Sequence, residues 1–221
     1  MAEIHCPVSN ESPTWDALEF AIWKLVPEKV GGGKIHIQGF KDAWVSHNKN
    51  YINSNAGKYQ FPPELLAGVC WIEVGGDPSF IDSVAFNVRA FDWSGPDWVD
   101  RKMTMTRDPS RTSFGAVSMQ LGTAAHAMGL DIKTMSNQQV RGLANCLQKD
   151  VFNIELVARH LRQLIDHDKL QKNPPSLDFD AVKIVGARYN RGMGLSLDQI
   201  RNNTSYGNFI VKFWSRFSGL I

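Results

Sequence analysis

A carboxylate, Glu73, stands at the end of an apolar segment with helical spacing. Pro62-Pro63 gives this segment a fixed-φ start, and Glu64 places a negative charge in its first turn. The apolar positions that follow are Leu65, Leu66, Val69, Cys70 and Ile72, and Gly75-Gly76 supplies a left-handed residue that ends the helix. Burial and the negative end of the helix dipole are expected to raise the pKa of Glu73, as a general acid needs. The alternative is a Glu that reaches solvent beside a turn.

Residues 81–112 form a stretch rich in aspartate, glycine and aromatic residues. Asp82, Asp92 and Asp97 lie near Trp93 and Trp98 in this stretch. Aromatic faces stack on sugar rings and carboxylates bind hydroxyls, so the stretch is a candidate functional loop close to Glu73. The alternative is a surface insertion with its own small aromatic cluster.

Composition and charge argue against several classes of function. The 221 residues are 43% hydrophobic and 21% charged, which is ordinary for a globular protein. The formal charge of +2 comes with no basic run among aromatics, so we expect no nucleic-acid partner. No apolar stretch is long enough to span a bilayer, and the first residues lack the basic start and apolar core of a secretory signal.

The histidines and cysteines form no recognisable metal-binding motif in the sequence. The six histidines form no HExxH or His-x-His pair, so neither a metal site nor an organic cofactor is expected. Cys6, Cys70 and Cys146 are an odd number of cysteines at no metal-ligand spacing. Cys70 and Cys146 fall in apolar helical patterns and are interpreted as buried thiols, so no disulfide scaffold is expected.

The elements that must position these groups are mainly helical. We expect helices with Ser12 as an N-cap before Pro13, over 119–128, after a capping box at Ser136, over 150–167, from Asp180 to about 192, and over about 205–217. Residues 34–38 alternate like a short strand, after a flexible Gly31-Gly32-Gly33 connector. The prediction is a predominantly α fold with one core, made of an N-terminal extension (1–45) and one domain (46–221).

Three separated segments carry a resemblance to a known family. They are Glu73 at a helix end, Gly115-Ala116-Val117-Ser118-Met119-Gln120 opening a helix, and Ala187-Arg188-Tyr189-Asn190-Arg191-Gly192 closing one. In this order they resemble the lysozyme-like superfamily, in the branch of soluble lytic transglycosylases and goose-type lysozymes. The resemblance covers about residues 60–195 and implies that residues 46–221 are a lysozyme-like catalytic domain. Val74 departs from it, because the family usually has a serine there that orients the catalytic carboxylate.

The resemblance implies cleavage of the β-1,4 bond between N-acetylmuramic acid and N-acetylglucosamine in peptidoglycan, with Glu73 as acid and base. A lytic transglycosylase needs no second carboxylate, whereas a goose-type muramidase adds an aspartate that holds water. Asp97 is the best candidate for that aspartate, with Asp82 and Asp92 behind it. The implied substrate contacts come from Ser118, Met119, Gln120, Tyr189 and Asn190. For Asn190 the alternative is a residue that anchors the end of its helix. For Tyr189 the alternative is a core aromatic, and for Gln120 an exposed first-turn residue.

Two further expectations concern the class of function and the compartment in which the protein acts. A second class of function is a catalytically silent peptidoglycan-binding module, which the absent serine at position 74 favours. Because peptidoglycan lies outside the cytoplasm, the protein is expected to be made in the cytoplasm and delivered to the periplasm or cell wall by a route without a signal peptide. A phage-type lysis enzyme and an antibacterial effector are both compatible, and an effector implies an immunity protein as partner.

Overall fold

The computed structural model describes residues 4, 6, 12–75, 110 and 112–221, and these residues are predominantly helical, as predicted. They fall into two compact units. Unit 1 comprises residues up to Trp44 together with Glu73–Asn153, and unit 2 comprises Val45–Ile72 together with Ile154–Ile221. In the described part of the chain, no helix combines the length and the apolar character needed to cross a bilayer. The division into an extension at 1–45 and a domain at 46–221 stays a prediction.

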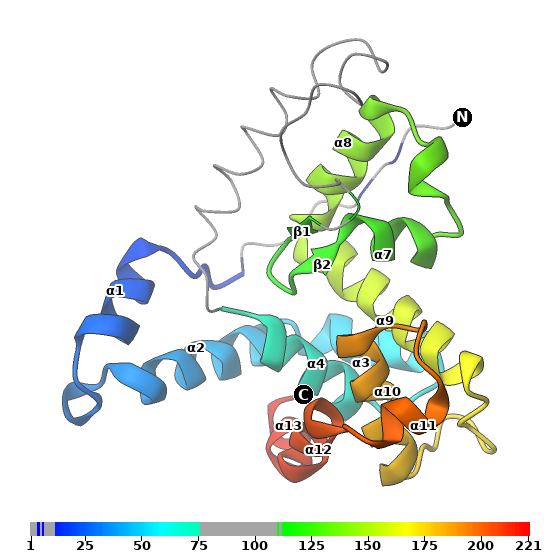
Figure 1. Ribbon diagram of the computed structural model, residues 1–221. Helices are drawn as coiled ribbons and strands as arrows, with labels where there is room; N and C mark the ends of the chain where they lie inside the picture. Colours follow the sequence, from blue (N-terminus) through cyan, green and yellow to red (C-terminus); the bar gives the residue numbers. More distant parts are fainter. Residues whose placement is uncertain (1–3, 5, 7–11, 76–109, 111) are drawn as a thin grey trace. The chain divides into compact units, whose positions relative to one another are not determined.

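Unit 1 begins with two consecutive helices, α1 (Ala17–Leu25) and α2 (Gly33–His47), joined by the short 3-10 helix η1 (Glu28–Val30) (Figure 1). The predicted N-cap at Ser12 is wrong: Asp16 caps α1, and its carboxylate accepts from the backbone N–H of Leu18 and Glu19 at 2.9 and 3.0 Å. The predicted strand at 34–38 is also wrong, because these residues belong to α2.

The rest of unit 1 is a small hairpin followed by helices. Strands β1 (Ser113–Phe114) and β2 (Met119–Gln120) pair antiparallel, and α7 (Leu121–Ala127), η3 (Ile132–Thr134) and α8 (Asn137–Leu147) follow. The capping box is confirmed, since Ser136 and Gln139 bond each other's backbone at the start of α8. The helix predicted over 119–128 begins only at Leu121, because β2 takes the two residues before it.

A disulfide joins Cys6 to Cys146 in unit 1, so the interpretation of Cys146 as a thiol is wrong. The two cysteines are 140 residues apart, and spacing in the sequence cannot predict a pair that only the fold brings together. Cys70 is a buried thiol, as predicted.

Unit 2 is a set of packed helices. It contains α3 (Lys49–Lys58), most of α4 (Pro63–Glu73), and α10 (Phe179–Arg191), α11 (Leu197–Arg201), α12 (Ser205–Lys212) and α13 (Trp214–Leu220). The helix α9 (Asp150–His167) confirms the prediction at 150–167. Helix α10 is capped by Asp178 rather than opened by Asp180, and the segment predicted at 205–217 is two helices that meet at Phe213.

Glycines let the helices of unit 2 approach closely. A Cβ on Gly68 of α4 would lie 2.9 Å from the Ile210 side chain of α12. Helices α10 and α12 come closer still, because a Cβ on Gly186 would lie 2.6 Å from the Cα of Gly207. Real side chains do not fit in such spaces, so these helices pack backbone against backbone or against side-chain ends.

Candidate functional site

Helix α4 holds Glu73 as its last residue, as predicted. Every residue from Leu65 to Trp71 is buried, which fits a helix that is apolar on all sides. Pro63 is the first helical residue, and Gly75 has a φ of +72°, so the start and the end of the helix follow the predicted signals. Glu73 itself is half-buried. The sequence therefore locates this carboxylate correctly on the fold.

Lys41 of α2 is the charged neighbour of Glu73 that the sequence analysis missed. It is only 8% exposed and shares one face of α2 with the buried Ile37 and Trp44. Burial lowers the pKa of Lys41 to about 8, and the negative charge of Glu73 acts in the opposite direction. The Phe40 ring would lie 3.3 Å from a Cβ on Gly75, so this part of α2 packs beside the end of α4.

The sequence contains a pattern that places Lys41 on a buried helix face. Residues 37, 41 and 44 recur at helical spacing, which places the lysine on the same face as an isoleucine and a tryptophan. Interpreting residues 34–38 as a strand hid this pattern. Since its pKa is about 8, Lys41 carries its charge most of the time at pH 7, and this charge favours the ionised form of Glu73.

The segment with Ser118, Met119 and Gln120 is a β-turn hairpin rather than the opening of a helix. Gly115 and Ser118 have φ values of +78° and +46°, and a Cβ on Gly115 would lie 2.0 Å from the carbonyl oxygen of Leu147. The buried Asn153 holds the turn: its amide donates to the Phe114 carbonyl at 3.2 Å, and its oxygen accepts from Val117 N–H at 3.3 Å.

The three predicted contact residues of this hairpin differ in exposure. Met119 is buried in the core, at 2% exposed, and so supports the hairpin from inside. Ser118 and Gln120 are exposed, and Gln120 is the residue before α7 without a side-chain cap bond. Asp97, with Asp82 and Asp92, lies outside the described residues.

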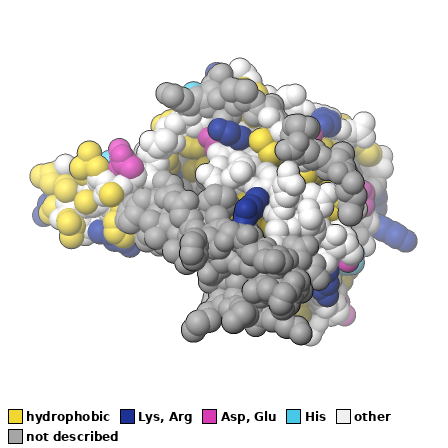
Figure 2. All heavy atoms as spheres, turned by 90° about the horizontal axis from the view of Figure 1, so that it is seen from above, with side chains coloured by type: hydrophobic (Ala, Val, Ile, Leu, Met, Phe, Trp, Pro, Cys, Tyr) yellow, Lys and Arg dark blue, Asp and Glu magenta, His cyan; other side chains and the backbone are white. Residues whose placement is uncertain are grey.

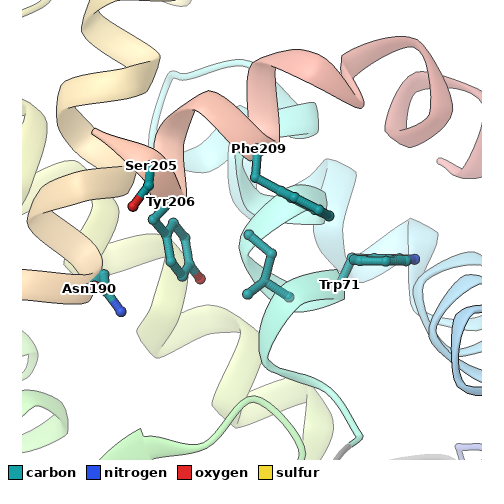
Figure 3. A pocket seen from close by; sticks show the side chains of 6 residues that line it. Trp71, Asn190, Ser205, Tyr206 and Phe209 are labelled. Atoms are coloured by element: carbon teal, nitrogen blue, oxygen red, sulfur yellow. The ribbon is translucent and has the colours of Figure 1, made fainter. Parts of the chain in front are cut away.

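Unit 2 contains a pocket of about 470 Å³, within the range of about 300–1,000 Å³ usual for small-molecule sites. Figure 3 shows Tyr206 and Phe209 pointing from α12 toward α4, with Asn190 of α10 at one end. The indole of Trp71 stacks on Phe209 with ring centroids 5.6 Å apart. The lining residues are Trp71, Ile72, Asn190, Ser205, Tyr206 and Phe209. Of these, only Asn190 is among the predicted site residues.

Tyr189 lies in an aromatic cluster next to this pocket. Its ring centroid is 6.0 Å from that of Tyr206 and 5.9 Å from that of His160, and the residue is half-buried. Tyr189 therefore packs against a wall residue of the pocket. Asn190, the next residue, is exposed and lines the pocket itself.

Arg188 fixes the end of α10 that carries both residues. Its guanidinium donates to the two carboxylate oxygens of Asp168 at 2.7 and 2.9 Å and to the Leu195 carbonyl at 2.6 Å. Both side chains of the pair are almost fully buried. A bidentate pair of this kind sets orientation as well as charge balance, so Asn190 is held on a rigid support.

The groups that line the pocket suit a polar, ring-shaped ligand. Aromatic faces in the pocket can stack on sugar rings, and the Asn190 amide and the Tyr206 and Ser205 hydroxyls can bond to sugar hydroxyls. Within the described ranges, no three His, Cys, Asp or Glu side chains are placed to hold a metal ion. Along α4, the wall residues Trp71 and Ile72 are followed directly by Glu73.

Comparison with known proteins adds no family to this picture. No family model, curated protein or solved structure matches the chain. The resemblance therefore depends on the three motif segments of the sequence alone.

Proposed function

We propose that this protein cleaves the glycan strand of peptidoglycan at the β-1,4 bond between N-acetylmuramic acid and N-acetylglucosamine, with Glu73 as acid and base. One observation carries the proposal. The last residue of the buried helix α4 is a half-buried carboxylate, and the two residues before it line an aromatic pocket. Glycoside cleavage needs a carboxyl group that protonates the leaving oxygen, and Glu73 follows the pocket residues Trp71 and Ile72 directly in the sequence.

The proposed reaction is that of a lytic transglycosylase. Protonated Glu73 gives its proton to the glycosidic oxygen, and the bond between this oxygen and C1 of N-acetylmuramic acid breaks with an oxocarbenium-like transition state. The Glu73 carboxylate then takes the proton of the C6 hydroxyl, whose oxygen bonds to C1 and closes a 1,6-anhydro ring. Lys41 supports the second step, because its positive charge favours the ionised carboxylate.

The charged state of Lys41 also bears on the first step. A general acid must be protonated when it meets the substrate, and a neighbouring ammonium disfavours that state. Because the pKa of Lys41 is about 8, the neutral amine is accessible close to physiological pH. At pH 7 the ammonium form predominates, so Lys41 opposes the protonated state of Glu73 that the first step needs.

A goose-type muramidase is the closest alternative enzyme. There Glu73 protonates the same oxygen, and water held by an aspartate attacks C1, which leaves a reducing end. Asp97 is the proposed holder of this water, ahead of Asp82 and Asp92. The two enzymes make different products from the same bond.

A catalytically silent peptidoglycan-binding module is the alternative of another class. It is favoured by Lys41, which can neutralise Glu73 as part of a structural ion pair, and by Val74, which is buried where the resemblance expects a serine. In that case the pocket would bind sugars and Glu73 would perform no chemistry.

Mass spectrometry of the soluble products from purified peptidoglycan separates the three possibilities. We expect anhydro-muropeptides from the wild type and none from Glu73→Gln, because the amide has no proton to give to the glycosidic oxygen. Glu64→Gln is the matched control: it makes the same change in the first turn of α4 and should leave the products unchanged. Circular dichroism checks that both variants fold.

Each other outcome has a clear meaning. Reducing-end products would identify the muramidase and direct mutagenesis to Asp97. Binding to insoluble peptidoglycan without any product from the wild type would identify the binding module. Anhydro products that persist in Glu73→Gln would refute the assignment of Glu73.

We also propose that the protein works outside the cytoplasm. The support is the Cys6–Cys146 disulfide, since disulfides persist in oxidising compartments such as the periplasm. Expression of the protein with an added periplasmic signal should lyse a bacterial host, whereas cytoplasmic expression should not. An antibacterial effector would in addition need an immunity protein, so the gene beside this one should protect the host when both are sent to the periplasm. Without such protection, the phage-type lysis enzyme is the better proposal.

A further inference from the structure

Helix α1 is rich in apolar residues that are not buried. It contains Leu18, Phe20, Ala21, Ile22, Trp23 and Leu25, yet none of its nine residues is buried. Leu18 is 66% exposed and Leu25 is 80% exposed. Helices with apolar residues on most sides are normally buried, and a contiguous exposed apolar surface marks a site of interaction.

The exposed apolar surface continues across the turn into α2. Val30 of η1 is 72% exposed and Ile35 of α2 is 58% exposed. We call residues 17–35, with these side chains, the helical hairpin. Figure 2 shows hydrophobic side chains gathered over α1, at the left of the view.

Contacts at one end hold the helical hairpin in shape. Trp15, just before α1, packs on Phe40 of α2 with ring centroids 4.7 Å apart, and His36 bonds to the Glu19 carboxylate. The turn is tight, because a Cβ on Gly32 would lie 2.1 Å from the Val26 carbonyl oxygen. The exposed residues of the turn are therefore presented by a structured element.

Lysines alternate with the exposed apolar residues of the turn. Lys24, Lys29 and Lys34 are all exposed, and each is followed directly by an exposed apolar residue: Leu25, Val30 and Ile35. The helical hairpin has two acidic residues, Glu28 and Glu19, and Glu19 bonds to His36. The Lys24 ammonium lies 3.5 Å from the centroid of the Trp23 ring, which is a cation–π geometry.

We propose that the helical hairpin docks this protein on an anionic lipid surface. Leu25, Val30 and Ile35 would enter the boundary between headgroups and acyl chains, while the adjacent lysines contact lipid phosphates. Long lysine stems suit this role, since they keep the charge in the headgroup layer while apolar neighbours are inserted. Tryptophan is enriched at the same depth, which fits Trp23.

The alternation of lysine and apolar residues is what favours lipid over protein. Lysine is depleted in protein–protein interfaces, whereas it is enriched on amphipathic surfaces that bind anionic membranes. A symmetric dimer through the helical hairpin would also bring like patches together, and the lysines of the two copies would repel. A second copy is therefore a poorer occupant than a surface of phosphate groups.

Vesicle flotation with the full chain tests this proposal, and it does not depend on glycan cleavage because no peptidoglycan is present. The probes are vesicles of phosphatidylcholine alone and vesicles in which phosphatidylglycerol replaces part of it. We expect binding to the anionic vesicles only, and weaker binding as salt is raised. Each lysine near an anionic surface is worth about fivefold in affinity, so the triple variant K24Q/K29Q/K34Q should bind about a hundredfold more weakly.

A second variant tests the apolar contribution. The triple variant L25S/V30S/I35S keeps every lysine and should bind at least about tenfold more weakly than the wild type. Matched controls are K149Q/K169Q/K172Q, which removes the same charge from exposed sites elsewhere, and F179S, which removes an apolar residue that is 49% exposed in α10. Both controls should bind like the wild type, and all variants should give the wild-type circular dichroism spectrum.

Three results would overturn the proposal. The first is no binding to either kind of vesicle. The second is binding that the two hairpin variants leave unchanged. The third is a dimer, seen by sedimentation velocity without lipid, that L25S/V30S/I35S dissociates while vesicle binding is absent; this would assign the helical hairpin to a second copy of the chain.

Discussion

Replacing Lys41 by methionine should stabilise the folded protein at pH 7 by up to about 3 kcal/mol. Burial lowers the pKa of Lys41 from 10.5 to about 8, and each pKa unit corresponds to about 1.36 kcal/mol. The folded protein therefore holds the ammonium at a cost of about 3 kcal/mol relative to the unfolded chain. Methionine keeps most of the buried stem and carries no charge, so this cost disappears.

The pH dependence gives the sharper test. Between pH 8 and pH 10.5 the unfolded chain binds more protons at this lysine than the folded protein does, so wild-type stability rises with pH in that window. The cost is fully present below pH 8 and has fallen below about 1 kcal/mol at pH 10. The difference in free energy of unfolding between K41M and the wild type should shrink accordingly.

Urea denaturation followed by tryptophan fluorescence measures this difference at pH 7 and at pH 10. Lys172→Met is the control, because Lys172 is exposed; it should change stability by less than about 0.5 kcal/mol at both pH values. In a Glu73→Gln background the gain from K41M should be larger, since the lysine there has lost its opposite charge. A K41M protein that is less stable than the wild type at pH 7 would refute the reasoning.

Two further substitutions test the supports of the site. Arg188→Ala should cost about 3–5 kcal/mol in urea denaturation, because it leaves the buried Asp168 carboxylate without its partner; a loss below about 1 kcal/mol would show that Asp168 finds another partner. Gly115→Ala should cost clearly more than Gly129→Ala, since both residues have a positive φ but only Gly115 has a carbonyl oxygen 2.0 Å from the added Cβ. Equal thermal stability of the two alanine variants would mean that backbone strain alone decides the cost at position 115.

The parts of the fold that the sequence predicted depend on local signals. Helix α4 follows from Pro63, its apolar positions and Gly75, and α8 follows from its capping box. Glu73 could be placed for the same reason, because its position depends on the helix that contains it. Asn190 was predicted through the resemblance and lines the pocket because α10 ends close to where its motif predicts.

The parts that the sequence missed depend on distant contacts. The hairpin at 113–120 is held by Asn153, more than 30 residues later, and no local pattern announces that contact. The pocket needs α4, α10 and α12 at once, so Tyr206 and Phe209 could not be assigned to it in advance. Lys41 was hidden for another reason, since its helix begins in a glycine-rich stretch that is typical of connectors.

Gly186 and Gly207 do not line the pocket, but the contact between them fixes how two of its walls are spaced. Helices α10 and α12 meet there without side chains, so no rotamer change can move one helix relative to the other. Asn190 lies four residues after Gly186 and Tyr206 lies directly before Gly207, so the two pocket residues are set at a nearly constant separation. The binding site between Asn190 and Tyr206 is therefore preorganised. Little conformational entropy of α10 and α12 is lost when a ligand binds there. What adaptation the pocket retains must come from the side chains of α4 and from Phe209.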